Sequence, residues 1–502
     1  MPTPPLPALA TATTVPRGTD VLVVGLAEDG LRTVPEAVEK AFGKRFGTTV
    51  EEMAASIGAK SSAGHTRTLP PVDGLRVIVV GLGEQEADGL GEALRQAAGS
   101  GVRQAGSLAG DQPLSVALSL GSATAEELQA VAEGALLGGY RYAGVSSEAA
   151  PNAPVSKVTV LHEGPTKTAD GASVTTVAPI VATAVLTARE WVNVPANLLY
   201  PASFADEVQT LVKDARITVE VLDEQELAAA GYGGLIAVGG GSVRPPRLVR
   251  LTYRPRGAKR HLALVGKGIT FDTGGLNLKP SDSMYTMKCD MAGAAAVLAA
   301  THAIARLGLK VKVTAYGALA ENMPGGSAYR PSDVLSIYGG KTVENGNSDA
   351  EGRLVMADAL ARSNADKPDL VVDVATLTGA CVVALGERTA GVMATDAPTA
   401  QRVLDAAQAA GEAFWPLPIP AETRAKLDSK VADLRSTGTD RWGGAMVAAA
   451  FLREFVDEGT PWAHLDIAGP AFHTGAPYGH VSPGGTGVGV RTLIALAGHL
   501  AR

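Results

Sequence analysis

Hydrophobic runs and polar, glycine-rich interruptions follow each other along the chain in a regular order. In the first third, short apolar runs predict strands, and longer segments with apolar residues every three or four positions predict helices. These strands are expected at residues 20–26, 76–81, 114–120 and 155–162, and the helices at about 90–105 and 125–142. Residues 1–18, rich in proline, threonine and alanine, predict a flexible arm, and the polar residues 43–70 predict a loop-rich region.

The same alternation continues to the end of the chain. A helix at about 178–194 is expected to lead into the second part. Further strands are predicted at 245–253, 261–265, 311–319, 370–377, 391–395 and 463–468, and helices at 292–307, 353–364, 400–411 and 445–457. Glycine-rich residues 231–234 and 239–242 predict mobile loops. The alternation predicts an α/β fold whose mixed, largely parallel sheet is flanked by helices.

Chain length favours two domains of this class. For 502 residues two domains are the usual expectation, and either could bury a core. We expect a flexible arm at 1–18, a small N-terminal α/β domain at 19–170 that serves packing or oligomer contacts, a linker helix at 171–195, and a larger C-terminal α/β domain at 196–502 that carries the chemistry.

Composition indicates a globular protein. Hydrophobic residues make up 46% of the chain and the mean hydropathy is +0.13, which argues against disorder. No apolar run reaches the roughly 18 residues of a membrane span, and we expect no secretory signal. Two cysteines, Cys289 and Cys381, are too few for a disulfide framework and suit a reducing cytoplasm. A net charge of −7 argues mildly against nucleic-acid binding by the whole surface, although a local basic patch stays open.

A first group of charged residues follows the predicted strand 261–265. That strand is expected to end in a glycine-broken loop, which carries Lys267, Asp272 and Lys279. Asp290 stands just before an alanine-rich helix. Glycines that permit close backbone approach to a bound group stand at 266, 268, 274 and 275. In open α/β sheets, ligands bind at strand ends of this kind.

Residues 345–354 form a second polar group. Asp349 and Glu351 stand two residues apart and Arg353 follows, at the predicted start of a helix. One interpretation is a simple helix entry, with Ser348 or Asp349 as the cap and Glu351 in the first turn. The other is a ligand site that faces the free amides of the first helical turn.

Carboxylates dominate both groups, and all eight histidines lie outside them. Such a set suits divalent ions such as Mg²⁺, Mn²⁺ or Zn²⁺. Four carboxylates could hold two ions if some of them bridge, and a metal pair roughly 3.5–4 Å apart is a known device for hydrolysis. Lys267 admits two interpretations. It is either a neutral amine that binds metal, with its pKa lowered by nearby dications, or a loop lysine paired with Asp272.

Several long motifs, in order along the chain, resemble the cytosol (leucyl) aminopeptidase family. The matching segments are Val265-Gly-Lys-Gly-Ile-Thr-Phe-Asp-Thr-Gly-Gly275, Lys279-Pro280, Asp290-Met291, Asn347-Ser-Asp-Ala-Glu-Gly-Arg-Leu354, Thr376-Leu-Thr-Gly-Ala380 and Trp462-Ala-His-Leu-Asp-Ile-Ala-Gly469. The resemblance covers roughly residue 189 to the C-terminus. It implies a metal-dependent exopeptidase that releases N-terminal residues, preferably leucine and other apolar ones, from peptides with a free N-terminus.

The resemblance also implies a role for each matching residue. One divalent ion would be bound by Lys267, Asp272, Asp290 and Glu351, and the other by Asp272, Asp349 and Glu351. The expected ions are Mn²⁺ or Zn²⁺, or Mg²⁺ or Co²⁺ at the exchangeable site. In the implied mechanism, a hydroxide that bridges the two ions attacks the peptide carbonyl, and Lys279 stabilises the resulting oxyanion.

Bicarbonate is the implied proton shuttle, and the implied assembly is a homohexamer. Arg353 is expected to hold the bicarbonate, with the amides of Ala350 and Gly352 and with Leu377 nearby. The hexamer would be a dimer of trimers whose active sites face an inner cavity, in the cytoplasm.

A side-chain pocket for the substrate is implied as well. The residues that match its lining are Met287, Thr376, Gly379 and Ala468. The alternative for these four is an ordinary core position. His464 lies in a segment that alternates as a strand does, so we interpret it as structural.

Some positions depart from the usual family pattern, and rival functions stay open. Ser348 stands where threonine is common, and Lys288-Cys289 where arginine-alanine is common. Because Cys289 adjoins Asp290, we hypothesise that it makes the enzyme sensitive to oxidation. The rivals are a Cys-Gly-type dipeptidase, a DNA-binding regulator on the same scaffold and, from a loose resemblance of residues 266–275 to kinase phosphate loops, an ATP-dependent phosphotransferase. The net negative charge argues against the DNA-binding regulator. The second polar group, at residues 345–354, argues against the phosphotransferase, which needs no such group.

Overall fold

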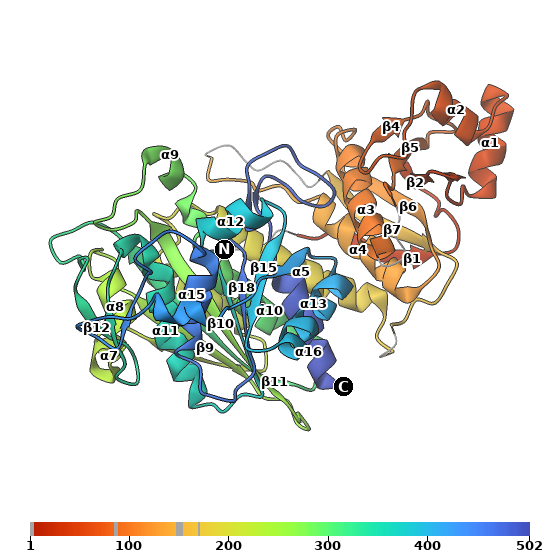
Figure 1. Ribbon diagram of the computed structural model, residues 1–502. Coiled ribbons are helices and arrows are strands. Elements are labelled where there is room, and N and C mark those ends of the chain that lie inside the picture. The colour runs from red at the N-terminus through yellow and green to blue at the C-terminus, as the bar shows by residue number, and fades with distance from the viewer. Residues whose placement is uncertain (1–4, 85–88, 147–153, 169–170) are drawn as a thin grey trace. The chain divides into compact units, whose positions relative to one another are not determined.

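The computed structural model describes residues 5–84, 89–146, 154–168 and 171–502, and it divides into two compact units (Figure 1). The N-terminal unit comprises the residues up to Leu186 together with Thr474–Pro483. The C-terminal unit comprises Thr187–His473 and Gly484–Arg502. One boundary falls inside a single helix, α5 (Val174–Asn193), and the chain crosses between the units again on either side of residues 474–483.

A mostly parallel sheet forms the centre of the N-terminal unit. The elements up to the dividing helix are β1 (Ala8–Ala12), β2 (Val21–Ala27), β3 (Gly30–Leu31), α1 (Glu36–Phe46), α2 (Val50–Ser56), β4 (Thr66–Thr68), β5 (Arg76–Gly81), α3 (Leu90–Gly106), β6 (Leu114–Ser122), α4 (Ala125–Gly138) and β7 (Val155–His162). The strand order is β1-β7-β6-β2-β5-β4, with β3 paired to β2. Strands β3 and β4 pair antiparallel with their neighbours, and the others pair parallel.

Two predictions for this unit need correction. Residues 43–70 are only partly loop, because α2, β4 and the end of α1 interrupt the loops. The Thr49 hydroxyl accepts from the Glu52 amide at 3.0 Å, and the Glu52 carboxylate accepts from the Thr49 amide at 3.1 Å, so a capping box starts α2. Within the predicted arm 1–18, residues 8–12 form β1 and pair with β7, while residues 1–4 lie outside the described part. Backbone pairing with a distant strand stabilises β1, and local composition does not reveal such pairing.

An eight-stranded sheet forms the centre of the C-terminal unit. Its elements are α6 (Pro201–Val212), β8 (Ile217–Leu222), α7 (Glu224–Ala230), α8 (Gly233–Gly239), β9 (Arg247–Tyr253), β10 (His261–Asp272), α9 (Ser281–Met284), α10 (Ala292–Leu307), β11 (Lys312–Asn322), β12 (Val334–Ser336), β13 (Thr342–Glu344), α11 (Glu351–Asn364), β14 (Leu370–Ala375), α12 (Gly379–Leu385), β15 (Ala390–Ala394), α13 (Ala397–Ala410), β16 (Phe414–Pro416), α14 (Glu422–Ala425), β17 (Leu434–Arg435), α15 (Gly444–Arg453), β18 (Trp462–Asp466), β19 (Phe472–His473), β20 (Gly484–Gly485) and α16 (Val490–Ala501). The strand order is β16-β15-β18-β14-β10-β11-β9-β8, and the central strands β18, β14, β10 and β11 are parallel.

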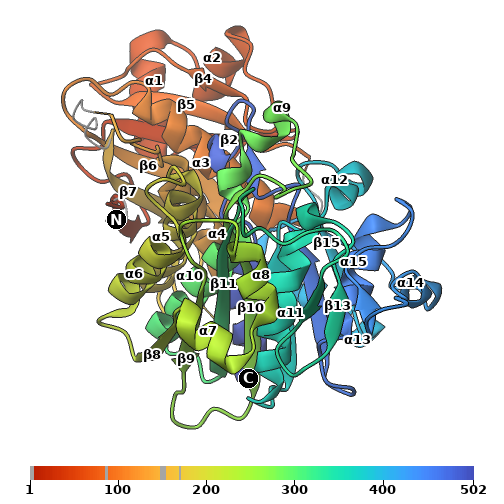
Figure 2. The ribbon, with the colours of Figure 1, turned by 90° about the vertical axis from the view of Figure 1, so that its left-hand side faces the viewer.

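Helices cover both faces of this sheet. Figure 1 shows α8, α11 and α15 on one side of the sheet and α10, α13 and α16 on the other, and the contacts between these helices agree. In Figure 2, strands β10 and β11 lie between α10 and α11. The predicted two-domain α/β class with helix-flanked mixed sheets is therefore confirmed. Within the described part of the chain, no helix is long and apolar enough to span a membrane.

The central strand β10 is longer than predicted. We expected a strand at 261–265 followed by a glycine-broken loop, but the strand continues to Asp272. A Cβ on Gly266 would lie 2.5 Å from Cα of Ala294 in α10, so this glycine serves the close packing of helix on strand. Left-handed backbone conformations begin after the strand, at Gly274 with φ of 86° and Gly275 with φ of 65°.

The glycine-rich segments between 231 and 242 were also misinterpreted as mobile loops. Much of this region is helix α8, which packs against α11. A Cβ on Gly233 would lie 2.0 Å from the Ser336 carbonyl oxygen. The buried Asp358 of α11 accepts hydrogen bonds from the amides of Leu235 at 2.7 Å and Tyr338 at 2.8 Å. Close packing therefore explains the glycines.

Candidate metal centre

Strand β10 and the starts of the two helices that cover it bring four charged side chains together. Lys267 lies within β10 and Asp272 ends it. Asp290 lies between a short 3-10 helix, Met287–Cys289, and α10, while Glu351 is the first residue of α11. Each of the four residues is at most 4% exposed. The two polar groups seen separately in the sequence thus form one buried cluster.

Lys267 joins two of the carboxylates. Its ammonium nitrogen lies 2.8 Å from Asp290 Oδ1 and 2.8 Å from Glu351 Oε1, and it donates to the Thr376 carbonyl at 3.0 Å. One carboxylate oxygen each from Asp272, Asp290 and Glu351 lies within 4.8 Å of the other two. Asp290 Oδ2 and Glu351 Oε2 are buried and have no hydrogen-bond partner. Buried oxygens without a partner are costly, so this donor set fits a divalent cation.

Lys279 connects Asp272 to the second polar group. Its ammonium lies 2.9 Å from Asp272 Oδ2 and 2.5 Å from Asp349 Oδ1. Asp349 is the most open member, with 32% of its side chain exposed. The alternative interpretation of Lys267 as the partner of Asp272 is wrong, since that carboxylate pairs with Lys279.

Electrostatics in the cluster reflect an excess of negative charge. Burial raises the pKa of Asp290 well above its ordinary value, and burial together with the charge of Glu351 raises the pKa of Asp272 to about 6. Burial opposes the charge of Lys267 as well, but Asp290 and Glu351 outweigh it and raise the Lys267 pKa. The Lys267 ammonium thus lies between the Asp290 and Glu351 carboxylates and offsets part of their negative charge. To bind a metal through its amine, Lys267 has to lose that proton.

Two residues that the sequence did not indicate support the site: Asn322 orients the Asp272 carboxylate, and both Asn322 and Tyr329 hold the Ser348 carbonyl. Asn322 Nδ2 donates to Asp272 Oδ1 at 2.8 Å and to the Ser348 carbonyl at 3.0 Å, and the Tyr329 hydroxyl donates to that same carbonyl at 2.7 Å. Asn322 is in register with Asp272 across the β10–β11 pair. Its place at the end of the neighbouring strand was the available signal, but strand pairing cannot be read from one segment.

The start of α11 is not capped as proposed. The side chain that accepts from the Asp349 amide belongs to Asn347, at 2.8 Å, and it caps a 3-10 turn at Ser348–Ala350. The Ser348 hydroxyl instead donates to the Gly274 carbonyl at 2.7 Å and accepts from the Asn277 amide at 2.8 Å. Neither Ser348 nor Asp349 is therefore the helix cap. Through these two hydrogen bonds, Ser348 connects residues 345–354 with the segment that follows β10.

Arg353 is 8% exposed and has one strong partner. Its Nη1 donates to the Ser436 carbonyl at 2.7 Å, and its Nε is buried without a partner. Burial lowers its pKa to about 10. An unpaired guanidinium donor fits a small anion. Two groups of the expected bicarbonate site are already engaged, since the Ala350 amide donates to the Asn347 carbonyl at 3.1 Å and the Leu377 amide to Asp466 Oδ1 at 3.2 Å.

Residues expected to line the substrate pocket are not ordinary core residues. None of these four is fully buried: Met287, Thr376, Gly379 and Ala468. Thr376 has a further contact, because its hydroxyl donates to Asp290 Oδ1 at 2.7 Å. Thr376 therefore orients a member of the carboxylate cluster.

His464 is part of a buried hydrogen-bonded group. Its Nδ1 lies 2.5 Å from Asp373 Oδ1, and Trp462 Nε1 donates to Asp373 Oδ2 at 2.7 Å. Asp373 and His464 are register partners on β14 and β18. This geometry links two central strands, in keeping with the structural role expected for His464.

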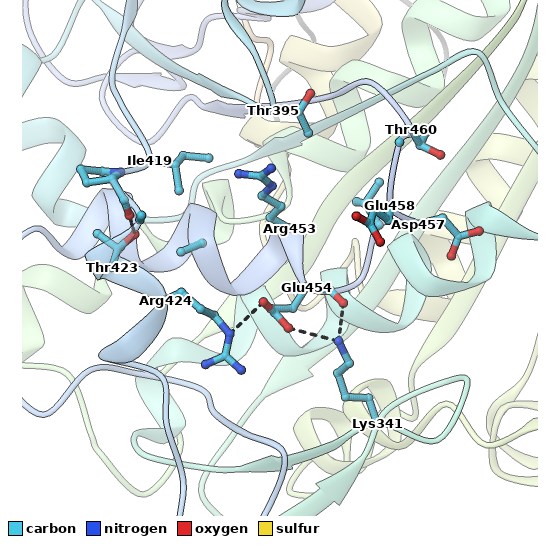
Figure 3. Close-up of a pocket in the computed structure, with 15 residues that line it drawn as sticks. Lys341, Thr395, Ile419, Thr423, Arg424, Arg453, Glu454, Asp457, Glu458 and Thr460 are labelled. Carbon is cyan, nitrogen blue, oxygen red and sulfur yellow. Dashed lines mark hydrogen bonds and ion pairs between the residues drawn. The ribbon is translucent and has the colours of Figure 1, made fainter.

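A cavity of about 620 Å³ in the same unit has a different character (Figure 3). Its charged Glu454 is held by Arg424 Nε at 2.8 Å and by Lys341 Nζ at 3.2 Å, the contacts drawn as dashed lines in Figure 3. Asp457 and Glu458 line this cavity as well, but among the described residues it is Asp272, Asp290 and Glu351 that bring three possible ligand atoms within 4.8 Å of one another, so the chemistry is expected there.

Two protein-family models together match most of this chain. A family model described as "Cytosol aminopeptidase family, catalytic domain" matches residues 186–494, and one described as "Cytosol aminopeptidase family, N-terminal domain" matches residues 23–149. A "Probable cytosol aminopeptidase" of Cutibacterium acnes is 52% identical, over 96% of this chain and 94% of that protein. A protein of the same name from Streptomyces griseus is 48% identical, over 97% of each.

Two solved structures resemble the whole chain. The "Bottromycin maturation enzyme BotP in complex with Mn" is 40% identical with a TM-score of 0.83, covering 96% of this chain and 100% of that one. A mutant of tomato leucine aminopeptidase is 29% identical with a TM-score of 0.85, covering 99% of this chain and 97% of that one.

Proposed function

Because this chain belongs to the cytosol aminopeptidase family, and is thus a metal-dependent aminopeptidase, we propose that it releases leucine and other apolar residues from the N-termini of peptides with the help of two divalent ions. The observation that carries the proposal is the buried cluster of Asp272, Asp290 and Glu351, in which two carboxylate oxygens lack a partner. The related enzyme BotP, whose structure is described as a complex with Mn, supports the proposal of a divalent metal.

The proposed ligand sets of the two ions share two residues. Lys267, Asp272, Asp290 and Glu351 would hold one ion, and Asp272, Asp349 and Glu351 the other. We propose Mn²⁺ or Zn²⁺, or Mg²⁺ or Co²⁺ at the exchangeable site, since carboxylates and one amine suit these ions. When bound, such ions polarise the peptide carbonyl and lower the pKa of a water molecule.

We propose catalytic roles for two residues that are not metal ligands, Lys279 and Arg353. The Lys279 ammonium lies 2.9 Å from Asp272 Oδ2 and 2.5 Å from Asp349 Oδ1, beside two of the residues that would hold metal. The ammonium can stabilise the oxyanion that forms at the attacked carbonyl. Arg353, with its unpaired Nε, would hold bicarbonate together with the Gly352 amide, and the bicarbonate would carry the proton.

We also propose a substrate pocket, an oligomeric state and a role for each domain. The half-open Met287, with Thr376, Gly379 and Ala468, would receive the first side chain of the peptide, and an apolar pocket with a methionine suits leucine. We propose a cytoplasmic homohexamer, built as a dimer of trimers. In it, residues 19–170 would serve packing and oligomer contacts, 171–195 would form the linker, and 196–502 would carry catalysis. The name of the two relatives, cytosol aminopeptidase, supports the cytoplasmic location.

Metal removal tests the proposed function. We expect chelated protein to lose hydrolysis of leucine p-nitroanilide and to regain it with Mn²⁺, Zn²⁺, Mg²⁺ or Co²⁺. Cys-Gly serves as a second substrate, and salt-dependent retention on DNA tests the regulator. If folded protein is inactive on the anilide with all four metals but cleaves Cys-Gly, the dipeptidase replaces our proposal.

Gly352 offers a sharp test of the cluster's packing. A Cβ on this residue would lie 2.6 Å from Lys267 Cε and 2.7 Å from Lys267 Nζ. Gly352→Ala should displace Lys267 and lower kcat/KM about tenfold to hundredfold, a loss typical for disturbed metal sites. Helix propensity favours alanine by about 1 kcal/mol, so the melting temperature should not fall as activity does.

The matched control for this substitution is Gly498→Ala in α16. A Cβ there has no neighbour within 4 Å, so activity should stay unchanged. Wild-type activity in Gly352→Ala would contradict the assigned role of Lys267. Equal losses in both variants would mean that helix rigidity, not Lys267, limits the rate.

The structure argues against the proposed oxidation sensitivity of Cys289. This residue is 8% exposed, and burial raises the pKa of its thiol to about 12. The thiolate is the reactive form, and little of it exists near neutral pH. Hydrogen peroxide should therefore inactivate wild type and Cys289→Ala at the same rate, with the buried Cys381→Ala as a control. Slower loss in Cys289→Ala alone would restore the oxidation hypothesis.

A further inference from the structure

A cavity of about 370 Å³ lies within the N-terminal unit, at the C-terminal ends of α3 and α4. Its volume is within the range of small-molecule sites, about 300–1,000 Å³. The ends of the two helices form part of its wall, and residues 139–142, Pro154 and three residues of the segment Thr474–Pro483, all in the same unit, form the rest. The polar and aromatic lining residues are Arg103, Tyr140, Arg141, Tyr142 and Ser482.

The cavity wall is held in place by close packing. A Cβ on Gly99 of α3 would lie 2.5 Å from Cα of His480, so the helix backbone and the segment 474–483 touch directly. Arg103 Nη2 donates to the Val481 carbonyl at 3.2 Å. A Cβ on Gly138, the last residue of α4, would lie 2.4 Å from the Gly99 carbonyl oxygen. The two helices and the segment therefore form one packed wall, and a ligand would meet a preformed site.

The charge of this cavity is not compensated. No acidic residue is among the described residues that line it. Burial lowers the pKa of Arg103, and the nearby charge of Arg141 lowers it further. The exposed Arg141 makes no hydrogen bond or ion pair with another described residue. Two arginines that line one cavity, with no acidic residue among its described lining residues, are a typical arrangement for binding an oxyanion.

A buried hydroxyl completes the polar part of the site. Ser482 is 8% exposed, and its Oγ has no hydrogen-bond partner. An unpaired buried hydroxyl costs free energy unless a ligand supplies the missing bond. The two tyrosines, with Pro154, Pro477 and Pro483, add aromatic and apolar surface beside the arginines. Arginines are favourable at helix C-termini by themselves, but that effect requires neither the cavity nor the unpaired serine.

We propose that this cavity binds a small organic phosphate. The phosphoryl dianion would lie between Arg103 and Arg141 and accept a hydrogen bond from Ser482, because two guanidinium charges match its charge. Its aromatic or sugar part would pack against Tyr140, Tyr142 and the prolines. The site shares no residue with the carboxylate cluster, and the proposal does not depend on the aminopeptidase function.

Calorimetric titration of the full-length, metal-loaded protein at low ionic strength tests this inference. The titrants are phenyl phosphate, inorganic phosphate and benzoate, which separate the ring, the phosphoryl group and a carboxylate. We expect phenyl phosphate to bind more tightly than the other two. Arg141→Met should weaken its binding at least about tenfold, since one charge-assisted contact is lost. Ser482→Ala and Arg103→Lys should weaken it less.

The matched control is Arg17→Met, which removes an exposed arginine of the same unit that does not line the cavity. Its affinity should equal that of the wild type. Equal binding by wild type, Arg141→Met and the control would place the anion elsewhere, such as at the metal centre, and would overturn the proposal. Absence of binding in the wild type would overturn it too, and tighter binding of benzoate than of phenyl phosphate would overturn the choice of phosphate.

Discussion

Glu351→Ala is expected to lower kcat/KM for leucine p-nitroanilide by at least about a thousandfold, whichever metal is supplied. Glu351 Oε1 lies 2.8 Å from the Lys267 ammonium, and Oε2 is buried without a partner. This carboxylate belongs to both proposed ligand sets, and altering groups that merely support a metal ligand already costs about tenfold to hundredfold. Elemental analysis should show reduced metal content in the same variant.

Two further variants separate a metal role from a folding role. Removing Glu351 leaves the buried Lys267 with one partner fewer, which is destabilising in itself. Glu351→Gln keeps the size and the hydrogen bonding of the side chain, and we expect a similar loss of activity with a folded protein. Glu422→Ala, on the exposed start of α14, should match wild type. A Glu351→Gln variant that keeps both its metal and its activity would refute the proposed ligand role.

Lys279→Met is expected to lower kcat by about a hundredfold to a thousandfold, the usual cost of removing one oxyanion-stabilising group. KM should change little, because the ammonium is proposed to act on the oxyanion rather than on the bound peptide. In the structure the ammonium lies 2.9 Å from Asp272 and 2.5 Å from Asp349, so it stands beside residues proposed to hold metal. Steady-state kinetics with saturating metal measure both constants.

Charge and position are tested separately at this site. Lys279→Arg keeps the positive charge, so we expect it to recover part of the lost rate. Lys430→Met removes an exposed lysine of the same unit and should leave the kinetics unchanged. If Lys279→Met instead raises KM with an unchanged kcat, the lysine binds the substrate and its proposed catalytic role is wrong.

Local pattern was sufficient for most of the secondary structure. The helix predicted at 292–307 is α10, and the strands predicted at 76–81 and 155–162 are β5 and β7, with the same bounds. Each of these elements is marked by its own apolar periodicity and flanking residues. Among the elements that were missed, β1 and α8 are stabilised by partners distant in sequence, namely β7 and α11.

Glycine was the main source of error. The sequence suggested that glycine marks breaks and mobile loops, which is its commonest meaning. At Gly266 and Gly233, however, the missing Cβ allows another backbone to approach within about 2–3 Å of where it would stand. Whether a glycine is a turn or a packing contact depends on what lies opposite, and that information is not local.

By itself, the sequence determined the fold class and the family, and it led to the proposal of which charged residues carry the chemistry, because these depend on residue types in order along the chain. Only the tertiary structure decided how those residues pair: Lys267 with Asp290 and Glu351, and Lys279 with Asp272 and Asp349. It also placed Asn322 beside Asp272 and set Arg103 near Arg141 over an unpaired Ser482. Such arrangements arise from strand register and helix packing, which bring together residues that no local pattern relates.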